Sequence, residues 1–223
     1  MEQAGSKRLT MKTKFFLPAS QLALLALLAL LTPALRAAEG WVRYDALPGG
    51  SKVKLDGTST IHDWSVESKL VAGYAEFDPA FDFDKPATGK VNARCVVTIP
   101  VRQLKSEKTA MDNVMYETMK QKVHPRIEYR LTEMTLKEAP KSADAPFVFD
   151  SKGELSLAGV TNKVAMPVSM TRVGKDKLKF AGSTSVKMTS FGLEPPKLIG
   201  ILSTGDDVKI AFEWLTGKKE ETK

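Results

Sequence analysis

The sequence is poor in the residues that build disulfides and metal centres. Among 223 residues there is one cysteine, Cys95, and there are two histidines, His62 and His124. One cysteine cannot form an internal disulfide, so the fold must depend on its core. A zinc site needs three or four cysteine, histidine or carboxylate ligands, and these few residues show no close spacing. The sequence therefore predicts no metal site.

A long hydrophobic run is also missing. The apolar stretch Leu22–Leu31 has ten residues, against the roughly 20 that a helix needs to cross a bilayer. A basic start precedes it, and Pro33 and small residues follow it, which is the pattern of a secretory signal peptide. We therefore predict a signal peptide at residues 1–38 and a periplasmic or secreted mature protein. A retained membrane anchor is the weaker alternative.

The mature chain has little net charge. Without residues 1–38, which hold five basic residues and one acidic residue, 28 basic and 25 acidic residues remain, a net charge of +3. No dense run of lysine and arginine lies in the interior of the chain, so nucleic acid is not an expected partner. About 185 residues suit one domain, which we place at residues 39–216. Residues 217–223 are predicted to be a disordered tail.

A two-residue alternation of apolar and polar side chains dominates this domain. In the segment 91–101 the odd positions are apolar and most even positions are polar. One face of such a strand lies in an interior and the other in water. The same period recurs at 126–131, 162–170 and 208–215. Turn-forming residues between strands lie at 47–50, 85–90, 139–146, 173–177 and 204–207.

Short turns between half-buried strands predict an all-β fold with antiparallel neighbours. Closing the sheet into a barrel removes exposed edges, and a barrel of about eight strands can enclose a small ligand. One segment, 106–123, breaks the pattern and predicts an inserted amphipathic α-helix that ends before Pro125. Its apolar stripe consists of Met111, Val114, Met115, Met119 and Val123.

The stretch "GTSTIHDW", residues 57–64, is the most unusual in composition. Interpreted as one strand, it places His62 and Trp64 on one face and Asp63 on the other. The adjacent His62 and Asp63 could then not form the contact of a catalytic triad. We interpret the stretch as the wall of a site for an amphiphilic ligand. The alternative is that Trp64 is ordinary core and His62 bonds to neighbouring backbone.

Four motifs in order resemble a known family. They are "STIHDWSV" (59–66), "MYETMKQKVHPRIEY" (115–129), "GELSLAGVTNKVAMPV" (153–168) and "STSVKMTSFGL" (183–193). The chain resembles the YceI-like, polyisoprenoid-binding exported proteins over nearly the whole mature chain. The resemblance implies an elongated, lipocalin-like antiparallel β-barrel, no catalysis, and an interior that holds an isoprenoid tail such as that of a quinone or a polyprenyl phosphate.

The chain departs from the family pattern at two motifs. Met111 stands where the family often has an arginine before the acid, here Asp112. Near the end, Lys187 and Ser190 replace an arginine and an acid. Both changes alter the charge available to an anionic head group such as pyrophosphate.

These observations together predict a carrier rather than an enzyme. We expect no cofactor other than a bound isoprenoid lipid or quinone. The side chains expected to contact the ligand are His62, Trp64, Cys95, Val97, Ile99, Met115, Met119, Tyr129, Met166 and Val168. Transient contact with a membrane and a homodimer both stay open.

Two other functions remain as alternatives. A structural or stress-related adaptor would have a barrel filled by its own side chains and would bind no lipid. An enzyme acting on a lipid or quinone is the least supported, because the chain shows no nucleophile and base pair and no metal cluster.

Overall fold

The computed structural model describes residues 40–142, 144–198 and 202–220. The signal peptide or membrane anchor predicted at residues 1–38 lies outside these described residues. Across the described ranges, no helix combines the length and the apolar character needed to span a bilayer.

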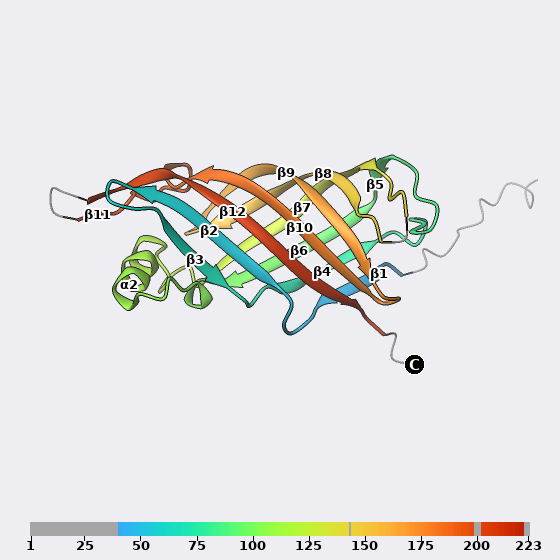
Figure 1. Ribbon diagram of the computed structural model, residues 1–223, viewed down its shortest axis with the longest axis horizontal. Coiled ribbons are helices and arrows are strands. Elements are labelled where there is room, and N and C mark those ends of the chain that lie inside the picture. The colour runs from blue at the N-terminus through green and yellow to red at the C-terminus, as the bar shows by residue number, and fades with distance from the viewer. Residues whose placement is uncertain (1–39, 143, 199–201, 221–223) are drawn as a thin grey trace, which may run out of the picture. The chain divides into compact units, whose positions relative to one another are not determined.

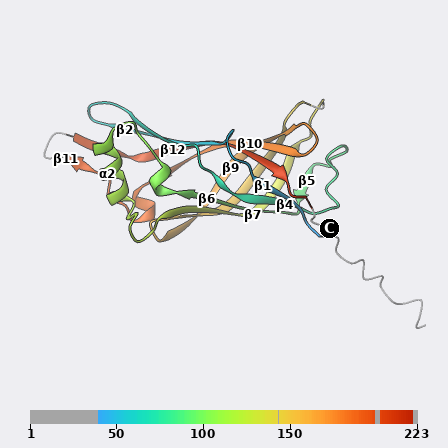
Figure 2. The same ribbon diagram turned by 90° about the horizontal axis from the view of Figure 1, so that it is seen from below.

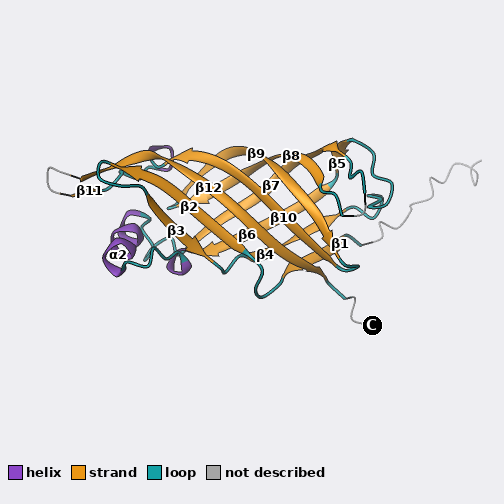
Figure 3. Cartoon of the chain, viewed as in Figure 1, coloured by secondary structure: helices purple, strands orange, loops and turns teal. Residues whose placement is uncertain are grey.

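Eight antiparallel strands close into a barrel (Figure 1). The described strands are β1 (Val42–Ala46), β2 (Lys52–Ser59), β3 (Trp64–Ser68), β4 (Ala72–Phe77), β5 (Gly89–Val91), β6 (Ala93–Pro100), β7 (Arg126–Glu138), β8 (Phe147–Leu157), β9 (Val160–Val173), β10 (Lys177–Lys187), β11 (Lys197–Leu198) and β12 (Leu202–Lys218). Pairing runs in the order β1-β4-β6-β7-β8-β9-β10-β12, and β12 pairs with β1 to complete the circle. The predicted all-β barrel is therefore confirmed, and the one α-helix among the described residues lies outside the wall (Figure 3).

The long strand β12 organises the closure. It pairs with β2 along residues 204–213 and with β1 along 216–218, so β1 and β2 lie end to end beside it. The predicted turn at 47–50 does lie between two strands, but β1 and β2 run in the same direction beside β12 and are not the antiparallel neighbours that we expected. The predicted turn at 204–207 is wrong, because these residues form an irregularity within β12.

The end of β12 corrects the predicted tail. Gly217 pairs with Lys177 on one side and Asp45 on the other, and Lys218 pairs with Tyr44. A disordered tail from residue 217 is therefore wrong for these two residues, which are held by two neighbouring strands. Residues 221–223 lie outside the described part of the chain.

The segment 57–66 is not one strand. β2 ends at Ser59, β3 begins at Trp64, and residues 60–63 form the loop of a hairpin. The Ser59 hydroxyl donates to the His62 carbonyl at 2.6 Å and accepts from the His62 N–H at 3.3 Å, which holds the turn. The inward positions change from odd in β2 to even in β3, so the predicted common face does not exist.

The helix α2 (Thr109–Thr118) is shorter than the predicted segment 106–123. Glu107 and Lys120 on its two sides have φ of 66° and 51°, outside the right-handed helical region. Only ten residues between these two positions are therefore in the α-helix.

The buried face of α2 also differs from the predicted stripe. Val114 and Val123 are 43% and 74% exposed, whereas Asp112 and Tyr116 are buried. The remaining members of the stripe do pack against the core and are Met111, Met115 and Met119. The buried polar groups require partners, which the segment before the helix supplies.

An aromatic cluster fills the barrel at the end where β1 and β5 lie, opposite the end that carries α2 (Figure 2). Its members are Tyr44, Phe77, Phe81, Phe83, Phe147 and Phe149. Phe81 and Phe83 come from the loop between β4 and β5 and meet edge to face with ring centroids 4.8 Å apart. Phe77, Phe147 and Phe149 are at most 1% exposed, so side chains pack this end completely.

Candidate functional site

The middle of the barrel encloses an apolar cavity. The cavity volume is about 140 Å³. An apolar cavity of roughly 150 Å³ is large enough to bind benzene. Inward side chains of β2, β4, β6, β7, β8, β9, β10 and β12 line the cavity of the barrel. The interior therefore offers empty apolar space for part of a ligand.

Partial exposure inside a closed barrel reveals this empty space. Val97, Ile99 and Met166 point inward but remain partly exposed, although they pack against the buried core. Their free surface faces the cavity. The contrast with the completely covered rings of Phe77 and Phe147 shows that the barrel is filled at one end and hollow in its middle. This hollow middle differs from the fully packed interior that the adaptor alternative predicts.

Six of the ten side chains predicted to contact a ligand line the cavity. They are Cys95, Val97, Ile99, Tyr129, Met166 and Val168. All six come from segments in which two-residue alternation identified the inward face.

The other four predicted residues lie elsewhere. His62 is exposed in the β2–β3 hairpin loop. Trp64 lies over Gly57 of the paired strand, and its indole N–H donates to the Thr58 carbonyl at 3.2 Å. Met115 and Met119 pack where α2 meets the core and are not part of the cavity lining.

Several large side chains of the lining were not among the predicted contacts. They include Leu55, Leu131, Phe180, Phe212 and Trp214. Phe212 and Trp214 lie on the apolar face of the segment 208–215, so the same alternation could have identified them. Leu55 was not assigned, because the predicted strand began at residue 57, whereas β2 begins at Lys52.

Two buried polar atoms of the lining have no hydrogen-bond partner among the described residues: the hydroxyl of Tyr129 and the Nε1 of Trp214. Burial raises the pKa of Tyr129 to about 12, although Ser151 opposes the shift. The Ser151 hydroxyl donates to the Met166 carbonyl at 2.9 Å, and no hydrogen bond of standard geometry joins it to Tyr129. Burial also raises the pKa of the Cys95 thiol to about 12. These groups are therefore neutral at physiological pH.

Charge is excluded from this interior. Arg94 is the one ionised residue among the described lining, and its side chain is exposed, with the guanidinium 4.0 Å from the centroid of the Trp41 ring. The residues next to Arg94 on β6 point inward, whereas Arg94 points outward. The cavity therefore offers apolar surface and a few neutral polar groups.

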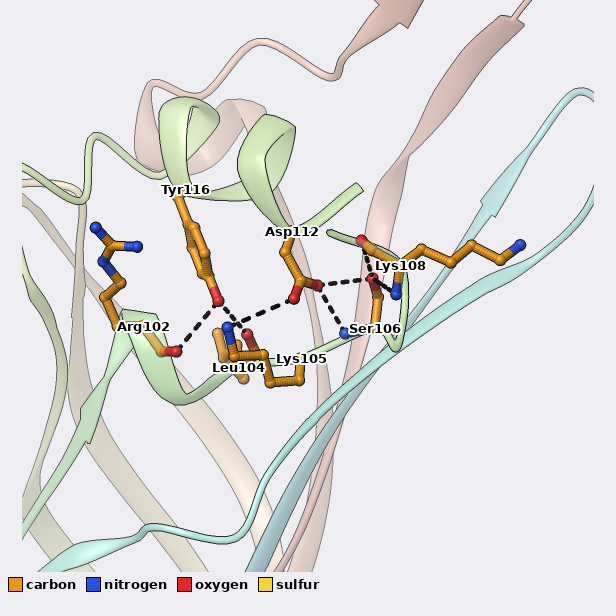
Figure 4. Close-up of polar contacts among 7 residues, drawn as sticks. All are labelled: Arg102, Leu104, Lys105, Ser106, Lys108, Asp112 and Tyr116. Carbon is orange, nitrogen blue, oxygen red and sulfur yellow. Dashed lines mark hydrogen bonds and ion pairs between the residues drawn. The ribbon is translucent and has the colours of Figure 1, made fainter. Parts of the chain in front are cut away.

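A polar network attaches α2 to the wall of the cavity (Figure 4). The Tyr116 hydroxyl donates to the carbonyl of Leu104 at 2.8 Å, and the Leu104 side chain lines the cavity. Asp112 accepts the backbone N–H and the hydroxyl of Ser106 at 2.8 and 2.7 Å, and its carboxylate lies 3.6 Å from the Lys105 ammonium. Burial acts to raise the pKa of Asp112, but Ser106 and Lys105 outweigh it, and the pKa is lowered.

The segment between β6 and α2 pairs with β3 through an isolated β-bridge. Glu67 of β3 and Lys105 exchange two backbone hydrogen bonds of 2.9 Å. The network from α2 thus holds a stretch of chain that pairs with β3 beside the cavity.

The closed eight-stranded barrel around an apolar cavity places the protein in the class of lipocalin-like barrels. The model of the YceI-like domain matches residues 44–214. The chain belongs to the YceI-like domain family. A comparison with curated protein sequences found no match.

Solved structures share the fold at low sequence identity. BcnA of Burkholderia cenocepacia is 20% identical, with a TM-score of 0.59 over 77% of this chain and 99% of that one. A polyisoprenoid binding domain from Saccharophagus degradans, implicated in plant cell wall breakdown, is 10% identical, with a TM-score of 0.61 over 80% and 99% of the two chains. The YceI protein of Campylobacter jejuni is 17% identical, with a TM-score of 0.52 over 70% and 85%.

Proposed function

We propose that the protein is an exported, non-catalytic carrier of a long-chain isoprenoid lipid, a quinone or a polyprenyl phosphate, whose tail lies inside the barrel. The enclosed apolar cavity is the observation that carries this proposal. Burying hydrocarbon contributes roughly 0.8 kcal/mol per CH₂ before the cost of ordering the chain. The similar structure from Saccharophagus degradans is a polyisoprenoid binding domain, which supports the same ligand class.

The character of the lining supports binding over catalysis. The Cys95 thiol, whose pKa is raised to about 12, is protonated at neutral pH and is a poor nucleophile. Export rests on the signal peptide predicted at residues 1–38. Transient membrane contact belongs to this proposal, because a lipid carrier must load from a bilayer, while the homodimer stays a prediction.

The first test is native mass spectrometry of the mature protein purified from its own host, followed by solvent extraction and lipid identification. We expect one isoprenoid molecule per chain. An empty protein that also refuses added quinones and polyprenyl phosphates would contradict the carrier function.

A second test blocks the cavity. Val97 lines it, so Val97→Trp should fill the space and abolish lipid loading while the barrel still folds. Val96→Trp is the matched control, because Val96 is the neighbouring valine of β6 and lies outside the lining. Loading is measured by native mass spectrometry and folding by circular dichroism. Equal loading of both variants would show that the lipid does not occupy this cavity.

A further inference from the structure

Two hydrogen-bond donors are buried in the cavity wall without acceptors. Tyr129 comes from β7 and Trp214 from β12, and neither the phenol hydroxyl nor the indole N–H has a partner in the part of the chain that the structure describes. Trp214 is only 2% exposed. A buried donor without an acceptor destabilises the folded state, so natural proteins seldom keep one without a reason.

The Tyr129 phenol can take its position only because Gly153 has no side chain. A Cβ atom at Gly153 would lie 2.4 to 2.5 Å from the ring and hydroxyl atoms of Tyr129, which is too close for any real contact. Gly153 lies one strand away on β8 and faces inward. The phenol therefore occupies space that any other residue at position 153 would remove, and its hydroxyl is held within the lining of the cavity.

The surrounding groups decide what could satisfy these donors. The Ser151 hydroxyl donates to the Met166 carbonyl; its oxygen can still accept and acts to lower the pKa of Tyr129, but the two side chains form no hydrogen bond of standard geometry. Tyr129 and Cys95 are both neutral, since burial raises the pKa of each to about 12. The guanidinium of Arg94 lies against Trp41 and not in the cavity. A phosphate inside would thus be an unpaired buried anion, whereas a carbonyl oxygen would accept a hydrogen bond without bringing charge.

We infer that the ligand carries a neutral hydrogen-bond acceptor, of the carbonyl type, which is bound inside the barrel by the Tyr129 hydroxyl, with the Trp214 N–H as a second donor along the cavity. The polar group of the ligand then lies within the barrel and not at an exposed mouth. This inference rests on the proposed lipid-carrier function and narrows its ligand class.

The test compares three probes of equal tail length: a benzoquinone with a tail of four isoprene units, the C20 isoprenoid hydrocarbon, and the corresponding isoprenoid phosphate. The wild-type protein should bind the quinone roughly three- to tenfold more tightly than the hydrocarbon, the value of one neutral hydrogen bond. Tyr129→Phe should lose this preference and keep its affinity for the hydrocarbon. Affinities come from competition against a fluorescent fatty-chain probe.

Tyr74→Phe is the matched control, because it also removes a phenol hydroxyl, but from a ring on the outer face of β4 that packs against Arg43. It should bind all three probes like the wild type. Infrared spectroscopy supplies an independent readout: the carbonyl stretch of the bound quinone should be lowered in frequency in the wild type and return toward its free value in Tyr129→Phe. The wild-type spectrum alone keeps the test decisive if the variant fails to fold.

The outcomes separate the two proposals. Binding of quinone and hydrocarbon with equal affinity, or tighter binding of the phosphate, overturns the inference and leaves the lipid carrier intact. An unshifted carbonyl stretch in the wild type overturns it as well. Failure to bind any of the three probes contradicts the carrier function itself.

Discussion

A cysteine inside a hollow barrel titrates differently from a cysteine in an unfolded chain. Cys95 is enclosed by apolar neighbours, and burial moves its pKa from 9.0 to about 12. Between these values the unfolded thiol has lost its proton and the folded thiol has not. The unfolded state then binds fewer protons, so the free energy of unfolding falls as the pH rises from about 9 to 12.

The Cys95→Ala variant tests this directly. It should show a smaller fall of the free energy of unfolding between pH 8.5 and 10.5 than the wild type, by at most about 1.4 kcal/mol per pH unit. Denaturant titrations at several pH values with a reducing agent present measure both slopes, and lysine titration cancels in the comparison. Identical slopes would place the folded pKa of the thiol near its ordinary value.

Single positions also show what alternation could and could not predict. The inward direction of Val97, Tyr129 and Met166 follows from the period of two, because successive side chains of a strand point to opposite faces. The lack of a partner for the Tyr129 hydroxyl does not follow from any local pattern. It depends on Ser151 and Gly153 in a strand paired across the sheet, and thus on the register of β7 and β8.

At the level of elements, α2 depends on a polar anchor more than on an apolar stripe. Asp112 is buried and accepts two hydrogen bonds from Ser106, both within 2.8 Å. Asp112→Ala should therefore destabilise the protein by about 1–3 kcal/mol, because it leaves the Ser106 donors without their acceptor. Denaturant unfolding measures the change.

The matched control is Asn113→Ala, one position further along α2, where the side chain is exposed. It should change the free energy of unfolding by less than about 0.5 kcal/mol. Equal effects at the two positions would mean that helix propensity, and not the anchor, determines the loss.

The predictions for the segment 57–66 and for α2 were wrong for physical reasons. β-branched Thr58, Thr60 and Ile61 favour a strand, but Ser59 turns the chain by bonding to His62 three residues later. In α2, the methionine and valine spacing predicted five core positions. The positive φ at Lys120 ends the helical course of the chain before Val123, which is left exposed.

At the level of the whole molecule, the closure of the barrel was predictable from the sequence. Which parts of its interior are filled by side chains was not. Many short half-buried strands favour closure because it leaves no exposed edge. Whether the middle is hollow depends on the summed volumes of side chains from eight strands. Phe81 and Phe83 illustrate this, since they come from a loop and yet complete the packing of one end.

The hollow middle also has a mechanical consequence. Apolar cavities of this kind stay dry, and hydrostatic pressure favours unfolding in proportion to the internal void that unfolding eliminates. The lipid-free protein should thus unfold at a lower pressure than the lipid-loaded protein, as measured by tryptophan fluorescence in a high-pressure cell. Val97→Trp, empty of lipid but with part of the void filled, should lie between them. The pressure at which the barrel unfolds would then show whether it holds a lipid.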